Sequence, residues 1–278
     1  MSNLCLPAEV LDYIADLLHD REVELRNCCL VSKSWIPRTR KHLFADIRLD
    51  GEEDLESWKE TFPDPPTSPA CYAETLIVGC PRLVTAADAE EGGWIKGFSH
   101  VMHLEVGSRA LHTDKAGVSL VPLHGLSPVV KSVRAYFITL PSSQIFDLVL
   151  SFPLLENLTT VAYGASADDV NGSDRPPTIV QPSSPPVFTG SLDLFLTRGV
   201  EHITRRLLSL PDGIHFREIV LTWFREEDSL LTMALVEKCS RTIETLDITC
   251  HLGTSIRHRG SQRFLILFSS WVGRDRPL

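Results

Sequence analysis

The sequence predicts an α/β protein in which a small N-terminal helical module precedes a curved solenoid of about seven irregular strand-and-helix units. Three observations lead to this division. Short amphipathic helix patterns fill residues 1–50, an acidic and then proline-rich stretch covers 51–70, and an apolar strand pattern recurs through 71–254. Residues 255–278 are left as a tail of uncertain character, because the strand pattern fails after His251.

Three short helices are predicted in the N-terminal module. Leu6-Pro7-Ala8-Glu9 resembles a helix start, since proline suits the first helical position and the helix dipole favours an early acid. Further helices are expected over 25–35 and 38–44. The apolar positions of the first helix share one face: Val10, Leu11, Ile14, Leu17 and Leu18. Helices this short make a poor independent core, so a partner or neighbouring domain is expected to cover them.

Three motif blocks occur in order at the N-terminus. They are Leu6-Pro7-x-Glu9-Val10-Leu11-x-x-Ile14, then Leu25 with Leu30-Val31-Ser32-Lys33-x-Trp35, then Leu43-Phe44. Together they closely resemble the F-box, over residues 4 to about 48. The polar Asp20–Glu24 loop departs from the pattern, because many F-boxes carry a proline there.

The F-box resemblance implies a partner. Members of the family bind a Skp-type adaptor, and through it a cullin-RING ubiquitin ligase. The residues that would contact the adaptor are Leu6, Pro7, Leu11, Ile14, Leu30, Val31 and Trp35. The alternative reading is a three-helix cap on the repeat domain without an adaptor.

Residues 51–70 are predicted to form a linker. Acidic residues (Glu52, Glu53, Asp54, Glu56, Glu60 and Asp64) come with four prolines between Pro63 and Pro69. The acidic run is interpreted as a solvated face, because its spacing does not match a calcium-binding loop.

A pattern of the form L-x-x-L-x-L returns after residue 70. Its central positions are 76, 104, 133, 158, 192, 219 and 246, which gives spacings of 28, 29, 25, 34, 27 and 27. Leucine-rich repeats have this strand signature and similar length. The spacing of 34 is explained by a loop-like insertion, Asn171–Pro186. Several repeats lack the usual asparagine.

Helices are expected between the strands, beginning near Ser142-Ser143 and near Asp228-Ser229. Stacking of such units gives a curved solenoid whose remaining strand side chains face the concave surface. The candidate target-binding residues on that surface are His103, Glu105, Arg134, Asn157, Thr159, Glu218 and Asp247, with Ser132 and Thr245 in the same row. The row is equally typical of any solvated sheet.

Blocks in the repeat region, such as Leu140-Pro-Ser-Ser-Gln-Ile-Phe-Asp-Leu and Cys239-Ser-x-Thr-Ile-Glu-Thr-Leu-Asp-Ile, resemble the large F-box families of mushroom-forming fungi. The tail from residue 255 is either a divergent cap or an altered end, and the sequence leaves both open.

The sequence offers no constellation for catalysis. It has no P-loop, H-E-x-x-H, G-x-S-x-G or G-x-G-x-x-G motif. Its seven cysteines lack zinc-ligand spacing and are interpreted as reduced thiols. His100 and His103 are interpreted as surface or packing residues. We expect no enzyme activity, cofactor or metal.

Charge and hydropathy limit the classes of partner that are expected. The net charge is −9, which disfavours nucleic acid despite the small patch Arg257, His258, Arg259 and Arg263. No long apolar run indicates a membrane span and no signal peptide is recognised, so a cytoplasmic or nuclear location is expected.

The sequence therefore predicts a non-catalytic substrate receptor of a Skp-cullin-F-box ubiquitin ligase, with the repeats binding an unknown protein target. The alternatives are an adaptor-bound scaffold or repeat-type interaction protein without a ubiquitylation target, and a degenerate family member with little function. The target, and any modification that it must carry, are not encoded in recognisable form.

Overall fold

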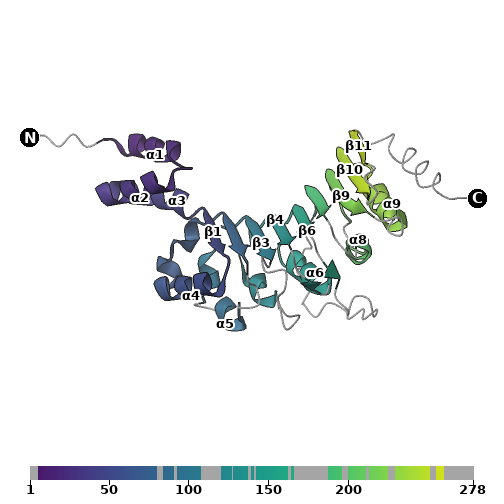
Figure 1. Ribbon diagram of the computed structural model, residues 1–278, viewed down its shortest axis with the longest axis horizontal. Coiled ribbons are helices and arrows are strands. Elements are labelled where there is room, and N and C mark those ends of the chain that lie inside the picture. The colour runs from purple at the N-terminus through teal and green to yellow at the C-terminus, as the bar shows by residue number, and fades with distance from the viewer. Residues whose placement is uncertain are drawn as a thin grey trace, which may run out of the picture.

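The structure is a computed structural model that describes residues 6–79, 84–90, 93–107, 120–126, 128–136, 139–140, 142–161, 164–165, 187–195, 200–210, 213–224, 229–250 and 255–259. The predicted insertion Asn171–Pro186 lies outside these ranges. An arched sheet runs along the molecule with helices on one side of it, and a separate group of helices stands at the N-terminal end (Figure 1). The protein is therefore α/β, with an open sheet.

The N-terminal group contains the helices expected from the sequence. Its elements are α1 (Ala8–Leu17), α2 (Glu22–Val31), the 3₁₀ helix η1 (Lys33–Trp35) and α3 (Ile36–Leu43). Pro7 lies at the N-cap of α1, one residue before the position expected for it. Pro37 occupies the first turn of α3, where its missing N–H has no intrahelical partner to lose.

One nine-stranded sheet forms the body of the molecule, in the order β1-β2-β3-β4-β6-β8-β9-β10-β11. Pairings from β1 through β10 are parallel, whereas β11 is antiparallel to β10. The strands are β1 (Asp46–Leu49), β2 (Thr75–Val78), β3 (His103–Gly107), β4 (Ser132–Tyr136), β6 (Asn157–Val161), β8 (Ser191–Phe195), β9 (Glu218–Phe224), β10 (Thr245–Cys250) and β11 (Ser255–Arg259). Short strands β5 (Thr139–Leu140) and β7 (Gly164–Ala165) pair separately.

Helices connect successive strands and pack on the convex face of the sheet (Figure 1). They are α4 (Glu52–Thr61), η2 (Pro65–Thr67), η3 (Pro69–Tyr72), α5 (Ala86–Ala89), η5 (Trp94–Gly97), η6 (Val121–Gly125), α6 (Ser142–Leu150), α8 (Val200–Leu208) and α9 (Ser229–Lys238). Both helices that the sequence predicts in this region are present, as α6 and α9. The α8 helix was not predicted.

The core lies between the sheet and these helices. All seven strands predicted from the repeat pattern are present, and their apolar positions are buried, for example Leu76, Leu104, Val133, Leu158, Leu192, Ile219 and Leu246. These residues are register partners on adjacent strands. The alternate positions therefore point away from the helices, toward the concave face.

A backbone motif recurs where each strand begins. Two successive N–H groups donate to a single carbonyl of the preceding unit, as Glu74 and Thr75 do to Ala45 O at 2.8 and 2.9 Å. Other carbonyls used in this way belong to Glu74, Met102, Lys131, Gly190 and Arg217. The repeated hydrogen bonds hold consecutive units in the same register.

The junction between β6 and β8 departs from this motif. It is also the junction at which the predicted repeat spacing is 34 residues. Here Gly190 N donates to Glu156 O, but Ser191 N donates instead to Asn157 Oδ1 at 2.8 Å. A Cβ on Gly190 would lie 2.1 Å from Asn157 Oδ1, so the close approach requires glycine. Asn157 replaces a backbone acceptor, and its side chain is committed to holding two strands together.

The expected linker at 51–70 is instead part of the folded body. Its acidic residues lie in α4, where Glu52, Glu53 and Asp54 suit the first turn and Asp54 caps the backbone of Gly51. Leu55 is 1% exposed and belongs to the core, and Pro69 and Ala70 in η3 are also buried. The acidic composition of this segment led to the prediction of a linker, although one apolar side of α4 packs against the core.

Two strands of the nine-stranded sheet were not predicted. β1 lies within the segment assigned to the N-terminal module, and it pairs with β2 as the first strand of the sheet. β11 comes from the tail of uncertain character, and it extends the sheet by antiparallel pairing with β10. Of the tail, the structure describes only residues 255–259.

The placement of α4 gives a direct test. Leu55→Ala is expected to lower the free energy of unfolding by about 2–5 kcal/mol, because it leaves a cavity between α4 and the sheet. Chemical denaturation of the full chain measures this. Ser57→Ala, at an exposed position of the same helix, should change stability by less than about 0.5 kcal/mol. Equal effects of the two changes would mean that α4 does not pack as described.

Candidate functional site

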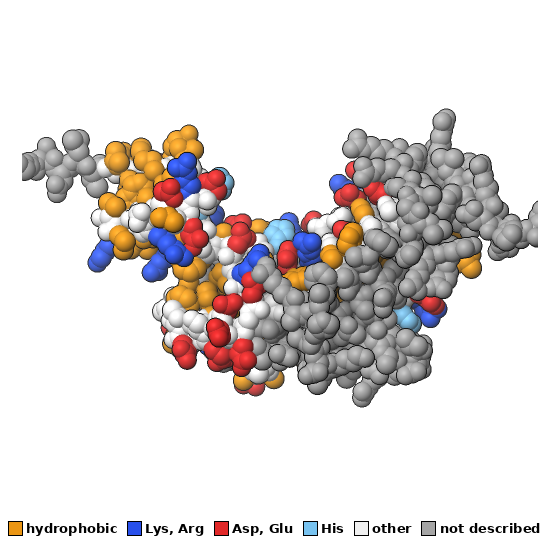
Figure 2. Space-filling model, viewed as in Figure 1, with side chains coloured by type: hydrophobic (Ala, Val, Ile, Leu, Met, Phe, Trp, Pro, Cys, Tyr) orange, Lys and Arg blue, Asp and Glu red, His pale blue; other side chains and the backbone are white. Residues whose placement is uncertain are grey.

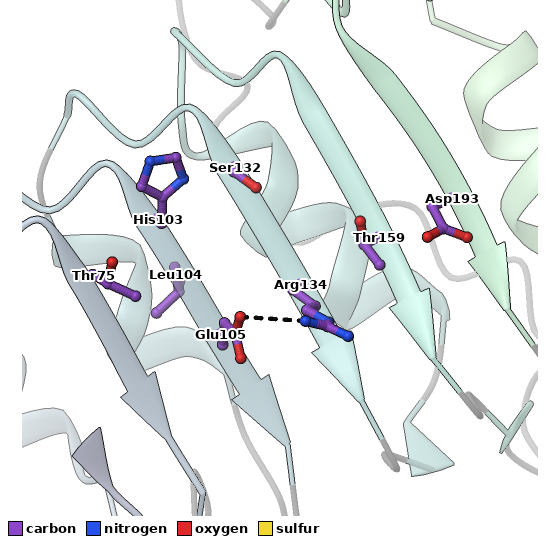
Figure 3. Close-up of a pocket in the computed structure, with 8 residues that line it drawn as sticks. All are labelled: Thr75, His103, Leu104, Glu105, Ser132, Arg134, Thr159 and Asp193. Atoms are coloured by element: carbon purple, nitrogen blue, oxygen red, sulfur yellow. Dashed lines mark ion pairs between the residues drawn. The ribbon is translucent and has the colours of Figure 1, made fainter. Parts of the chain in front are cut away.

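The concave face of the sheet carries an open hollow of about 420 Å³. Five adjacent strands, β2, β3, β4, β6 and β8, supply its lining. The lining residues are Thr75, His103, Leu104, Glu105, Ser132, Arg134, Thr159 and Asp193. Figure 3 shows these side chains standing in rows across β2, β3, β4, β6 and β8. Charged and histidine side chains gather in the same hollow in the space-filling view (Figure 2).

The rows follow from the strand register. Glu105 on β3 is the register partner of Arg134 on β4, which is the partner of Thr159 on β6, which is the partner of Asp193 on β8. Arg134 Nη1 lies 3.6 Å from Glu105 Oε1, and both side chains are partly exposed. Neighbouring strands lie about 5 Å apart, so parallel pairing brings residues that are distant in the chain close together in space.

Asp193 is the most constrained group of this row. Its Oδ1 atom is buried and accepts no hydrogen bond within the part of the chain that the structure describes. Burial raises the pKa of Asp193, with Arg134 lowering it and Glu218 raising it to smaller extents. Because Oδ1 is shielded from water and accepts no hydrogen bond there, the ionised form of Asp193 is costly to keep.

The hollow contains four of the seven residues predicted to bind a target: His103, Glu105, Arg134 and Thr159. Glu218 and Asp247 also occupy concave-face positions, but on β9 and β10, beyond the lining of the hollow. Asn157 has a structural role as well, since its amide oxygen accepts from Ser191 N at 2.8 Å and from Ser191 Oγ at 3.1 Å. That side chain holds β8 to β6.

Sequence reasoning missed Thr75 and Asp193. The signal for Asp193 was available, because it lies between Leu192 and Leu194 and strand alternation places it on the concave face. The sequence pattern of that repeat is only partial, so Asp193 was not included among the candidate target-binding residues. Thr75 was missed because the first repeat unit was read only for its buried positions.

A second candidate surface is apolar and lies on the N-terminal helices. Of twelve large hydrophobic side chains that are exposed in the described ranges, seven fall between residues 6 and 31: Leu6, Val10, Tyr13, Leu17, Val23, Leu30 and Val31. Figure 2 shows hydrophobic side chains covering much of this end of the molecule. We call these seven residues the apolar surface. Such a concentration is typical of an interaction site.

Helical spacing explains how the apolar surface forms. Val10, Tyr13 and Leu17 follow one stripe of α1, which Leu6 precedes by two residues, and Val23, Leu30 and Val31 share a side of α2. The opposite sides of the helices form the small internal core of the module, with Leu11 7%, Ala15 0% and Leu25 1% exposed. The module therefore has apolar residues on two sides, and one of them is uncovered.

The residues predicted to contact an adaptor divide between these two sides. Leu6, Pro7, Leu30 and Val31 are exposed, with Leu30 at 85%. Ile14 and Trp35 are half-buried. Leu11 is a core residue of the module, so its main contribution is to folding. Tyr13 and Val23 were not singled out from the sequence, although both lie on the exposed stripes.

Asp16 joins the helices of the module. Its carboxylate accepts hydrogen bonds from Arg38 Nε and Nη2, both at 2.6 Å, and lies 2.7 Å from His42 Nε2. The hydrogen bonds from Arg38, followed by that of His42, hold the pKa of Asp16 well below its usual value. This bidentate pair fixes α1 against α3 and so sets the orientation of the exposed stripe on α1.

No family model matches the chain, and neither a curated protein nor a solved structure matches it. Within the described residues, no helix is both long and apolar enough to cross a membrane.

The environment of Asp193 predicts a pH-dependent stability. Because its pKa is raised in the folded state, ionisation costs stability as pH rises from the ordinary value of 3.8 through the folded pKa. Asp193→Asn is therefore expected to raise the melting temperature at pH 7, with a gain that shrinks toward pH 4. Thermal denaturation across this range measures the effect. A stability loss at pH 7 would contradict the assigned environment.

The ion pair of Asp16 with Arg38 predicts the opposite dependence of stability on pH. A lowered pKa contributes stability that is present above pH 3.8 and is lost as pH falls through the folded pKa. Arg38→Ala is expected to speed amide exchange in α1 and α3 at pH 7. The control is Arg26→Ala, which removes an exposed i,i+4 pair with Glu22 on α2. Similar exchange in both variants would show that Asp16 does not hold the module together.

Proposed function

We propose that this chain is a non-catalytic substrate receptor of a Skp-cullin-F-box ubiquitin ligase. The N-terminal module is the F-box, the apolar surface binds a Skp-type adaptor, and the strand-and-helix units form a leucine-rich repeat solenoid that binds a protein target on its concave face. The chain supplies proximity and orientation, while its partners carry out the ubiquitin chemistry.

The apolar surface is the observation that carries the proposal. Seven large hydrophobic side chains are exposed within 26 residues, whereas the whole of the rest of the described chain exposes five and buries most others in its core. Exposing them to water is unfavourable by about 25 cal/mol for each Å² of apolar surface, so an occupant is expected. The position of this surface on the F-box-like residues supports an adaptor as the proposed occupant.

The connection between the module and the sheet supports the receptor role. Two residues, Phe44 and Ala45, separate the end of α3 from the start of β1. Phe44 contacts Phe62 edge-on at 6.4 Å between ring centroids, and Phe62 packs on Trp58 at 4.7 Å. Trp58 in turn packs on Phe98 of the core at 5.6 Å. This continuous packing suits a receptor that must present its target in a defined direction.

The test uses two exposed leucine and valine positions of α2. Leu30→Asp/Val31→Asp in the full chain should weaken binding to a purified Skp-type adaptor by about 100-fold or more, since two apolar contacts of about 1.5 kcal/mol each are lost. Calorimetry or surface plasmon resonance measures the affinity. Both side chains are at least 75% exposed, so folding should be retained.

Leu230→Asp is the matched control, because Leu230 is 76% exposed but lies on α9 at the other end of the sheet. It should bind the adaptor as the unmodified chain does. Failure of the folded, unmodified chain to bind any Skp-type adaptor would overturn the receptor proposal. Adaptor binding without a change in the abundance of any captured target on deletion of the chain would favour the scaffold alternative.

A further inference from the structure

We infer that three exposed cations of the N-terminal module, Lys33, Arg40 and Lys41, bind an acidic segment of the Skp-type adaptor at the border of the apolar surface. We call these three residues the basic row. The inference rests on the proposed function, in which the apolar surface holds the adaptor, and it names the charge that the adaptor carries beside its apolar contacts.

The charge of residues 25–45 is opposite to that of the whole chain. This stretch contains no Asp or Glu and five Lys or Arg residues, whereas the chain has a net charge of −9. Two of the five cations are neutralised inside the module, because Arg38 donates to Asp16 and Arg26 pairs with Glu22. The other three are the basic row, and none of them forms an ion pair with any residue that the structure describes.

Helix geometry places the basic row on one side of the module. The 3₁₀ helix η1 runs directly into α3, so residues 33–43 form one continuous helical segment. The basic row occupies the first, eighth and ninth positions of this segment, which share a side of a helix. All three side chains are exposed. The other side carries Thr39, which is fully buried, and Arg38 and His42, which contact Asp16.

The basic row borders the apolar surface. Leu30 and Val31 are 85% and 75% exposed at the end of α2, and only Ser32 separates Val31 from Lys33. The Cα atoms of Val31 and Lys33 therefore lie at most about 7 Å apart. Ser32 Oγ accepts a hydrogen bond from Ser34 N at 3.3 Å, which fixes the turn between the two helices. Figure 2 shows Lys and Arg side chains beside the hydrophobic ones at this end of the molecule. A partner that covers Leu30 and Val31 thus reaches Lys33.

Size and charge favour an acidic protein segment over a nucleic acid. The basic row extends over about 12 Å of helix, which matches a few neighbouring carboxylates. An extended polyanion would also meet the field of a chain with a net charge of −9, and that field repels it. Protein interfaces commonly surround an apolar centre with a polar rim. Carboxylates at the rim of the adaptor's apolar contacts would lie opposite the basic row.

The experiment measures association and dissociation rates of the full chain with a purified Skp-type adaptor by surface plasmon resonance, at salt concentrations from about 0.05 to 1 M. Lys33→Gln/Arg40→Gln/Lys41→Gln should slow association about ten-fold at the lowest salt, with little change in dissociation, because charges at the rim act mainly on association. The difference should disappear at the highest salt, where the screening length is about 3 Å.

Lys96→Gln/Lys238→Gln/Arg241→Gln is the charge-matched control. It removes three exposed cations outside the module, from η5, from the end of α9 and from the residues that follow α9. This variant should associate as the unmodified chain does. An equal loss in the control would assign the effect to net charge and overturn the inference.

The remaining outcomes separate the basic row from the receptor proposal. Adaptor association that is unchanged in the basic-row variant, but is lost in Leu30→Asp/Val31→Asp, would overturn the basic row and keep the proposed function. Failure of the folded, unmodified chain to bind the adaptor would overturn both. Binding of a mixed-sequence single-stranded oligonucleotide that the basic-row variant abolishes, without a change in adaptor association, would assign the row to nucleic acid and also overturn the inference.

Discussion

Each parallel strand of the nine-stranded sheet is four to seven residues long, and it can bury its apolar residues only by lying beside the next strand and beneath a connecting helix. Register partners such as Leu104, Val133 and Leu158 form a continuous buried row across several strands. No single unit provides such a row, so the units stabilise one another. The shared carbonyl acceptor at the start of β2, β3, β4, β6, β9 and β10 fixes how far one unit can slide against the next.

The same register creates the concave face. Because successive side chains alternate, fixing the buried row also fixes a second row of Glu105, Arg134, Thr159 and Asp193. Their grouping is a consequence of packing on the opposite face. Asp193 and Asn157 illustrate two outcomes for a polar side chain in this setting. Asn157 finds hydrogen-bond donors in Ser191 and becomes part of the framework, whereas the buried Oδ1 atom of Asp193 accepts no hydrogen bond among the residues that the structure describes.

The N-terminal module follows a different principle. Its internal core is small, with Leu11, Ala15 and Leu25 buried, and the carboxylate of Asp16 links α1 to α3 through Arg38 and His42. An apolar stripe remains uncovered on α1 and another on α2. The aromatic contacts from Phe44 to Phe98 attach this module to the first strands of the sheet. Under the proposed function, one end of a connected body would thus bind an adaptor while its hollow binds a target.

The sequence by itself determined the α/β class, seven strands, three N-terminal helices and the alternation that directs His103, Glu105, Arg134 and Thr159 to one face. These follow from local periodicity, which a single sequence carries. It did not determine that α4 packs in the core, because Leu55 is one apolar residue among acids. Nor did it place Leu11 inside the module and Tyr13 outside it, since both lie on apolar stripes of one helix. Which stripe is covered depends on α2 and α3, and the placement of Asp193 in the same row as Arg134 depends on strand pairing across 59 residues of chain. Only the tertiary structure decides such contacts, because they arise between segments whose separation local patterns do not encode.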